Sequence, residues 1–176
     1  LRFNHQRFAR PAVMDSLGLT EKRYIVFTLN RTAIIGNDDE LRALLVSMMS
    51  HTGDIPVVAP LRQLAADAVQ CIINENPLLF ENLHIVEPLD YLHFGYLTAN
   101  ALGVVTDSGN VAEEATFNTV PCITLNSYTE HIETVKVGSN VLVGEDPVLL
   151  GEEMARMVDG KWKHCGIPER WDGRSA

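Results

Sequence analysis

Short apolar runs alternate along this chain with longer segments of helical periodicity, and this alternation most constrains the fold. The runs are apolar throughout, which is typical of strands that are buried on both faces. A helix-length segment separates each run from the next, so the strands are expected to be parallel and joined by crossovers. The expected strands cover 24–29, 56–59, 83–86, 102–106, 121–125 and 140–143. The pattern predicts an α/β fold, a Rossmann-like doubly wound parallel sheet.

The intervening segments carry apolar residues at helical spacing, several of them after acidic residues, proline or glycine. The expected helices cover 38–49, 61–73, 91–101, 109–117, 129–135 and 147–158. Met48 and Met49 are expected to pack in the core. We expect one Rossmann-like domain over 1–176, with an inter-domain helix in 1–18 and a C-terminal tail in 161–176.

Composition narrows the classes of partner. The chain has 176 residues, enough for one domain of ordinary size with a proper core. Its net charge is −9 and no stripe of Lys and Arg follows the chain, so nucleic acid is not an expected partner. The negative charge does not exclude a single nucleotide as a ligand, because backbone amides can bind its phosphates. No apolar run is long enough to cross a membrane and no signal peptide is recognised, so no membrane partner is expected.

Residues that often carry chemistry are too scattered here to form a recognised centre. Cys71, Cys122 and Cys165 fit neither a disulfide framework nor a zinc pattern, so we expect reduced thiols and a cytoplasmic protein. Five histidines lack metal-ligand spacing and are expected at surface or capping positions: His5, His51, His84, His93 and His164. Ser108 lacks the glycine two residues before it that a nucleophile elbow requires, which disfavours a hydrolase. No metal site is expected.

The segment 104–115 is the most informative for function. An apolar strand ends in Asp107-Ser108-Gly109, and a helix begins at once. The free N–H groups and the dipole of a helix N-terminus attract anions, and glycine lets a ligand approach the backbone. Glu114 is placed to accept hydrogen bonds from a ribose, and the helical phase directs Glu113 toward solvent. Asp-Ser-Gly before a helix is also a common capping arrangement, so both carboxylates can equally be ordinary helix residues.

Ligands of doubly wound sheets bind at the carboxyl ends of the strands. Polar residues gather in the loops that follow the expected strands: Asn30 and Arg31, Arg62 and Gln63, Ser108 and Gly109, and 126–130. We expect several of these loops to converge. No glycine-rich fingerprint follows the first strand, so NAD or FAD is not expected.

The order of motifs resembles the C-terminal half of the non-hydrolysing UDP-N-acetylglucosamine 2-epimerases, two-domain enzymes similar in fold to GT-B glycosyltransferases. The segment 106–109 with Glu113 and Glu114 is similar to the family's TDSGG…EE signature. Further similar segments are 87–94 (EPLDYLHF), Pro121 at a strand entry, 129–133 (TEHIE, against TERPE), 142–144 (LVG) and the tail 171–176. The resemblance extends over nearly the whole chain.

The resemblance implies a UDP-binding site. Phe94 occupies the position of an aromatic residue that stacks on uracil, Ser108 that of a diphosphate ligand, and Glu114 that of the residue that binds the ribose hydroxyls. Arg31 and Gly109 belong to the same implied site. Further loop contacts are implied for Asn126, Thr129, Glu130 and His131.

Several positions depart from the family pattern. The first strand of the family ends in His-Arg-x-Glu-Asn, whereas 30–34 reads Asn-Arg-Thr-Ala-Ile and keeps only the arginine. Asn30 cannot replace the charge or the proton chemistry of the family histidine. The other replacements are Asn110 for the second glycine of TDSGG, Asn126 and His131 for two arginines, and Leu61-Arg62 where a histidine is expected. These changes indicate a divergent member whose substrate can differ from the family's.

The resemblance implies an isomerase. In the family, the acid/base carboxylates lie mainly in the N-terminal domain, so no catalytic residue is assigned in this chain. We expect the 176 residues to be one domain of a longer protein, inactive without the absent N-terminal catalytic domain. The reaction implied for the full-length protein is epimerisation of UDP-GlcNAc to UDP-ManNAc by anti elimination and re-addition of UDP. No metal or organic cofactor is implied.

The implied partners are UDP or a UDP-sugar, the protein's own N-terminal domain and, for the full-length protein, a second copy in a homodimer. Two other interpretations stay open. The first is a non-catalytic or regulatory nucleotide-sugar-binding module, which Asn30 and Asn126 favour because they replace a histidine and an arginine. The second is the donor-binding half of a GT-B glycosyltransferase, which would use a similar domain.

Overall fold

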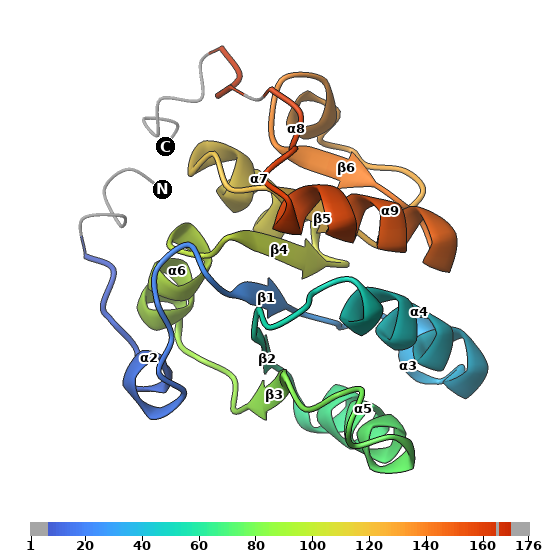
Figure 1. The fold of residues 1–176 in the computed structure, drawn as a ribbon. Coiled ribbons are helices and arrows are strands. Elements are labelled where there is room, and N and C mark those ends of the chain that lie inside the picture. Colours follow the sequence, from blue (N-terminus) through green and yellow to red (C-terminus); the bar gives the residue numbers. More distant parts are fainter. Residues whose placement is uncertain (1–6, 165, 170–176) are drawn as a thin grey trace.

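The computed structural model describes residues 7–164 and 166–169. Within them, one sheet of six strands has the order β3-β2-β1-β4-β5-β6, and all neighbouring strands are parallel. The strands are β1 (Ile25–Phe27), β2 (Val57–Pro60), β3 (Leu83–Val86), β4 (Gly103–Thr106), β5 (Cys122–Thr124) and β6 (Asn140–Leu142). The predicted doubly wound parallel sheet is confirmed (Figure 1).

Helices cover both faces of the sheet (Figure 1). They are α2 (Val13–Ser16), α3 (Thr32–Ile35), α4 (Asp38–Ser50), α5 (Gln63–Glu75), α6 (Tyr91–Ala99), α7 (Gly109–Phe117), α8 (Glu133–Lys136) and α9 (Pro147–Val158). One core cluster joins the sheet to α3, α4, α5 and α9, and a second joins it to α2, α6 and α7. Because successive side chains of a strand point to opposite faces, β1 sends Ile25 and Phe27 into the first cluster and Val26 into the second.

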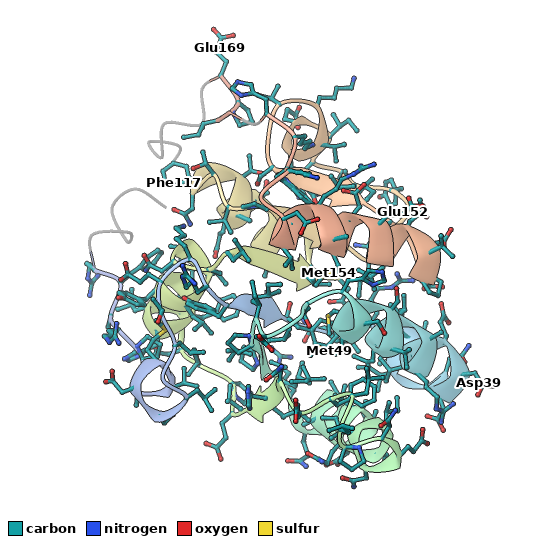
Figure 2. The ribbon with its side chains drawn as sticks, in the orientation of Figure 1. Asp39, Met49, Phe117, Glu152, Met154 and Glu169 are labelled. Carbon is teal, nitrogen blue, oxygen red and sulfur yellow. The ribbon has the colours of Figure 1, made fainter. Side chains whose placement is uncertain are left out.

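The contact between α4 and α9 closes one side of the core. Met48 and Met49 are 1% and 6% exposed, so their predicted place in the core is confirmed. Figure 2 shows the side chains of Met49 and Met154 between these two helices, whereas Asp39 and Glu152 point outward. Burying a side chain of this size contributes about 1.5–3 kcal/mol to folding, which explains why the apolar spacing of α4 predicted its orientation.

Local capping sets where three of the helices begin. The Asn37 side chain accepts a hydrogen bond from the Glu40 N–H at the start of α4, and Asp90 accepts one from the His93 N–H at the start of α6. Asp146 caps α9, whose first residue is Pro147. Such caps satisfy N–H groups that have no partner inside the helix. Because capping residues are of a few types, the sequence could indicate where these three helices begin.

Three expectations need correction. The described part of 1–18 holds one helical turn, Val13–Ser16, instead of an inter-domain helix, while residues 1–6 lie outside the described residues. The helix expected over 129–135 begins only at Glu133, because the Thr129 hydroxyl accepts a hydrogen bond from the His131 N–H and forms a turn. The turn expected before α4 contains the additional short helix α3. In the expected tail, residues 161–164 and 166–169 form neither helix nor strand, and 165 and 170–176 are not described.

Cys71 and Cys122 are free thiols, as expected, and burial raises the pKa of Cys122 to about 12. Cys165 and His5 lie outside the described residues. Among the described residues, no helix has the length and apolar character needed to span a membrane.

Candidate functional site

The strand order reverses between β1 and β4. From β1 the chain moves outward to β2 and β3, whereas from β4 it moves outward to β5 and β6 in the opposite direction. The loops after these two strands therefore separate and leave a crevice at their carboxyl ends, which is where ligands of doubly wound sheets bind. The loops after β1, β4, β5 and β6 meet at this crevice.

Asp107 fixes three of these loops to one another. Its Oδ2 accepts hydrogen bonds from the backbone N–H groups of Asn30 (2.8 Å) and Arg31 (2.6 Å). Its backbone carbonyl accepts a hydrogen bond from Asn126 Nδ2 at 3.1 Å. The residue is only 7% exposed, and its Oδ1 is buried without a hydrogen-bond partner among the described residues. The loop after β1 therefore depends on a charged acceptor supplied by the loop after β4.

Arg31 links the same loops through its side chain. Nη1 donates to the backbone carbonyl of Leu125 and to Asn126 Oδ1, both at 3.0 Å. Nη2 forms an ion pair with Glu145 Oε1, also at 3.0 Å. The side chains of Arg31 and Glu145 are 41% and 37% exposed, so this pair lies at the surface of the crevice. The one cation retained from the family motif is thus partly occupied by the protein itself.

The N-terminus of α7 offers unused hydrogen-bond donors. The Ser108 N–H donates to Thr106 Oγ1 at 3.0 Å, and the Ser108 side chain makes no capping bond. Among the described residues, the N–H groups of Gly109, Asn110 and Val111 have no hydrogen-bond acceptor. Such donors, together with the helix dipole, form a ready site for an anion.

His131 lies against this corner. A Cβ on Gly109 would stand 3.4 Å from His131 Cδ2. His131 Nδ1 lies 2.8 Å from Glu113 Oε1, and the two side chains are 36% and 30% exposed. The expectation that Glu113 faces water is therefore wrong. Glu113 lies on the outer side of α7, as the helical phase predicts, but the loop before α8 covers it and places His131 against its carboxylate.

Glu114 is half-buried, and it is the carboxylate that the helical phase placed at the edge of the crevice. Burial, followed by the charge of Glu113, raises the pKa of its carboxyl. A desolvated carboxylate gains most from hydrogen-bond donors, because it has lost those of water. Ribose hydroxyls would supply such donors.

The structure gives the remaining expected residues different surroundings. Phe94 lies on α6 and packs, partly buried, against the core cluster that includes Val104 and Ala112. Thr129 forms the turn described above, and Glu130 accepts a hydrogen bond from the Tyr128 hydroxyl at 3.2 Å. Gln63 donates a hydrogen bond to Asp67 within α5. Among the described residues, no hydrogen bond or ion pair joins Arg62 or Gln63 to the loops after β1, β4 and β5 that Asp107 connects.

Sequence reasoning did not assign a role to two residues of the crevice. Asp107 was recognised as part of the turn after β4, but its hydrogen bonds to the loop after β1 were not expected. Glu145 follows the LVG segment as an ordinary surface residue, and its pairing with Arg31 depends on the fold. The described residues contain no group of three His, Cys, Asp or Glu side chains able to hold a metal ion. His51 and His93 bond within or beside their own helices, as expected for capping residues.

The sequence profile of the UDP-N-acetylglucosamine 2-epimerases matches residues 2–174. The chain belongs to this family. A "UDP-N-acetylglucosamine 2-epimerase homolog" of Methanococcus maripaludis is 30% identical over 145 residues, which are 82% of this chain and 40% of that protein. The UDP-N-acetylglucosamine 2-epimerase of Methanocaldococcus jannaschii is 45% identical over 86 residues, which are 48% of this chain and 24% of that protein.

A solved structure agrees with the sequence relatives. The Methanocaldococcus jannaschii UDP-GlcNAc 2-epimerase, crystallised in complex with UDP-GlcNAc and UDP, matches 93% of this chain with a TM-score of 0.73 and 28% identity. The match covers 46% of that chain. This epimerase-family chain therefore spans less than half the length of the relatives it matches. The expected Rossmann-like fold of GT-B type is confirmed, since its structural neighbours are epimerases of that type.

Proposed function

We propose that this chain is the UDP-binding C-terminal domain of a UDP-N-acetylglucosamine 2-epimerase-like isomerase. The observation that carries the proposal is the α7 N-terminus at the strand-order reversal, where three consecutive N–H groups lack an acceptor among the described residues. The half-buried Glu114 carboxyl follows in the next turn. Membership of the family and the UDP bound to the solved M. jannaschii relative support the same ligand.

The proposed contacts divide the nucleotide into three parts. The N–H groups of 109–111 and the Ser108 hydroxyl bind the diphosphate, because they combine unused donors with the positive end of the helix dipole. Glu114 accepts hydrogen bonds from the ribose hydroxyls. Phe94 stacks on the uracil ring with the face that the core leaves exposed. Arg31 is connected to the phosphate corner, since it donates to Asn126, whose amide in turn donates to the Asp107 carbonyl.

The loop over this corner supplies the remaining proposed contacts: Asn126, Thr129, Glu130 and His131. His131 is the strongest of them because it already lies against Gly109. A phosphate at the α7 N-terminus would therefore meet an imidazole on one side and main-chain N–H groups on the other. Glu113 competes with that phosphate for His131.

The proposed reaction of the full-length protein needs groups that this chain does not supply. A base removes the C2 proton of UDP-GlcNAc, the C1–O bond breaks, and UDP leaves with the electron pair to give 2-acetamidoglucal. Re-addition of UDP at C1 and of a proton to the opposite face of C2 gives UDP-ManNAc. Asn30 cannot act as the acid or base here, because its amide does not titrate near neutral pH. We assign the proton transfers to the N-terminal domain, so this domain alone is inactive.

Calorimetric titration with UDP, UDP-GlcNAc, UMP and ADP tests the proposal. Half of a cleft should bind weakly, with a Kd of about 0.1–1 mM, or roughly −5 kcal/mol. Ser108→Ala and Glu114→Ala should weaken UDP binding, whereas Glu152→Ala should not, because Glu152 is exposed on α9 away from the crevice. Equal affinity for ADP and UDP, or UDP binding that neither site variant weakens, would contradict the proposal.

A second function is favoured by one observation: the exposed Asn30 stands where the family has a titrating histidine. The full-length protein would then bind a nucleotide sugar without converting it. Incubation with UDP-GlcNAc in D₂O separates the two functions, because proton abstraction and return replace the C2 hydrogen by deuterium. Deuterium at C2 supports the isomerase, whereas binding without exchange supports a non-catalytic module.

A further inference from the structure

Acidic side chains lie near Arg31, and their negative charge opposes the binding of an anionic ligand there. The guanidinium belongs to the loop after β1, and Glu145 reaches it from the loop after β6 at 3.0 Å. Glu40 of α4 lies within hydrogen-bonding reach of Glu145, and this contact raises the pKa of Glu40. The carboxylate of Asp107 holds the backbone N–H of the same arginine at 2.6 Å. One carboxylate, Glu145, thus pairs with the guanidinium, Glu40 lies beside that carboxylate, and Asp107 binds the main chain of the same arginine.

The Arg31–Glu145 pair is placed so that it can open. Both side chains are more than a third exposed, and exposed ion pairs contribute little to stability because water and salt screen them. The other end of the guanidinium is held more firmly, since Nη1 donates to both Leu125 O and Asn126 Oδ1. Losing Glu145 therefore leaves Arg31 in place, with Nη2 free for another acceptor.

We propose that Glu145 is an internal competitor for Arg31, which a nucleotide diphosphate must displace and which lowers the affinity of the site for anionic ligands. This inference rests on the proposed UDP site. The mechanism is competition between two acceptors for Arg31 Nη2, because carboxylate and phosphate oxygens both accept charge-assisted N–H bonds from arginine. A neutral nucleoside does not enter this competition. Glu145 thereby affects the recognition of the phosphates and leaves that of the base unchanged.

Glu145→Gln tests the inference, because it removes the charge and keeps the size of the side chain. We expect it to tighten UDP binding about threefold to fivefold, which corresponds to about 0.7–1 kcal/mol at 1.4 kcal/mol per tenfold. That is the upper range for an exposed ion pair. Uridine, which has no phosphate, should bind both proteins equally. Glu152→Gln, an equal change of charge on the outer side of α9, is the matched control and should leave both affinities unchanged.

A double-variant cycle assigns the gain to Arg31. Arg31→Gln should weaken UDP binding, and Glu145→Gln added to it should bring no further gain, because the contested cation is gone. The outcomes separate the two claims. If wild type does not bind UDP at millimolar concentration, the proposed function fails and the inference fails with it. If wild type binds UDP but Glu145→Gln does not tighten it, or tightens uridine equally, only the inference is overturned.

Discussion

The buried carboxylate of Asp107 accepts two main-chain hydrogen bonds, so replacing it should loosen the loop after β1. Asp107→Ala leaves the N–H groups of Asn30 and Arg31 without their acceptor. Two hydrogen bonds to a charged group contribute about 3–6 kcal/mol together, at about 1.5–3 kcal/mol each. Removing a carboxylate that is 7% exposed also returns part of its desolvation cost, which is several kcal/mol for a buried ion. We expect a net loss of about 2–4 kcal/mol in the free energy of unfolding.

Asp107→Asn separates the contribution of the charge from that of the acceptor. The amide oxygen can still accept both N–H bonds, at roughly half the strength of a carboxylate. Its NH₂ group takes the place of Oδ1, which has no partner among the described residues. Because the smaller desolvation cost offsets part of the lost bonding, the expected loss is about 1 kcal/mol.

Urea unfolding followed by circular dichroism measures both changes, and an unchanged slope with denaturant indicates that the folded state is intact. Asp54→Ala is the control, because Asp54 is an exposed carboxylate away from the crevice. If Asp107→Ala lies within about 0.5 kcal/mol of wild type, the two N–H bonds do not outweigh the cost of burying the charge. The account of Asp107 as the link between the loops would then be wrong.

Three further substitutions give sharp expectations. Glu114→Gln should raise the melting temperature at pH 7 and weaken UDP binding, because burial raises the pKa of this carboxyl and so penalises its charged form. The gain should shrink as the pH falls through the raised pKa of Glu114 toward the unfolded value of about 4.3, and it should be absent well below that value, where both proteins are neutral at this position. A gain independent of pH would refute the cause. Gly109→Ala should change the unfolding free energy by less than about 1 kcal/mol, since a Cβ meets His131 only at 3.4 Å. It should weaken UDP about tenfold in calorimetry, and unchanged affinity would exclude close approach of the phosphate. Gly138→Ala should lower the free energy of unfolding in urea by about 1–3 kcal/mol, because its Cβ would lie 2.4 Å from Thr116 Cγ2 and 2.7 Å from the Thr134 carbonyl oxygen. An unchanged urea midpoint would contradict this, since it would mean that the backbone around Gly138 moves aside at no cost.

The parts of the fold that sequence predicted are those with local causes. Strand β3 and helices α7 and α9 were expected with the bounds that the structure has. For α9, Asp146 and Pro147 mark the first turn, and the apolar spacing sets the buried face. For α7, Asp-Ser-Gly after an apolar run marks the strand end and the helix start together. Signals of this kind need only a few neighbouring residues, so one sequence suffices to read them.

The parts that sequence missed depend on contacts between distant segments. The start of α8 moved to Glu133 because the Thr129 hydroxyl stabilises a turn instead of a helix, a choice that helical periodicity does not reveal. The pairs His131–Glu113 and Arg31–Glu145 join loops that follow different strands. Loop geometry decides these pairs, and their residue types are ordinary at surface positions. The charge balance of the candidate site therefore could not be predicted from the sequence.

That charge balance bears on what this domain can do. The donors that we propose for the phosphates are mainly main-chain N–H groups at α7, whose positions follow from the fold and do not depend on any one side chain. The side chains that could bind phosphate are replaced or already paired: Asn126 stands where the resemblance places an arginine, Arg31 is paired with Glu145, and His131 lies against Glu113. A site of this composition retains nucleotide binding more readily than proton transfer, since binding needs only aligned dipoles whereas acid–base chemistry needs a titrating group at a defined atom. Affinity for UDP and turnover should therefore respond differently to substitution in this protein. In the proposed full-length enzyme, changes at the α7 corner should reduce both, and changes in the proposed N-terminal domain should reduce turnover alone.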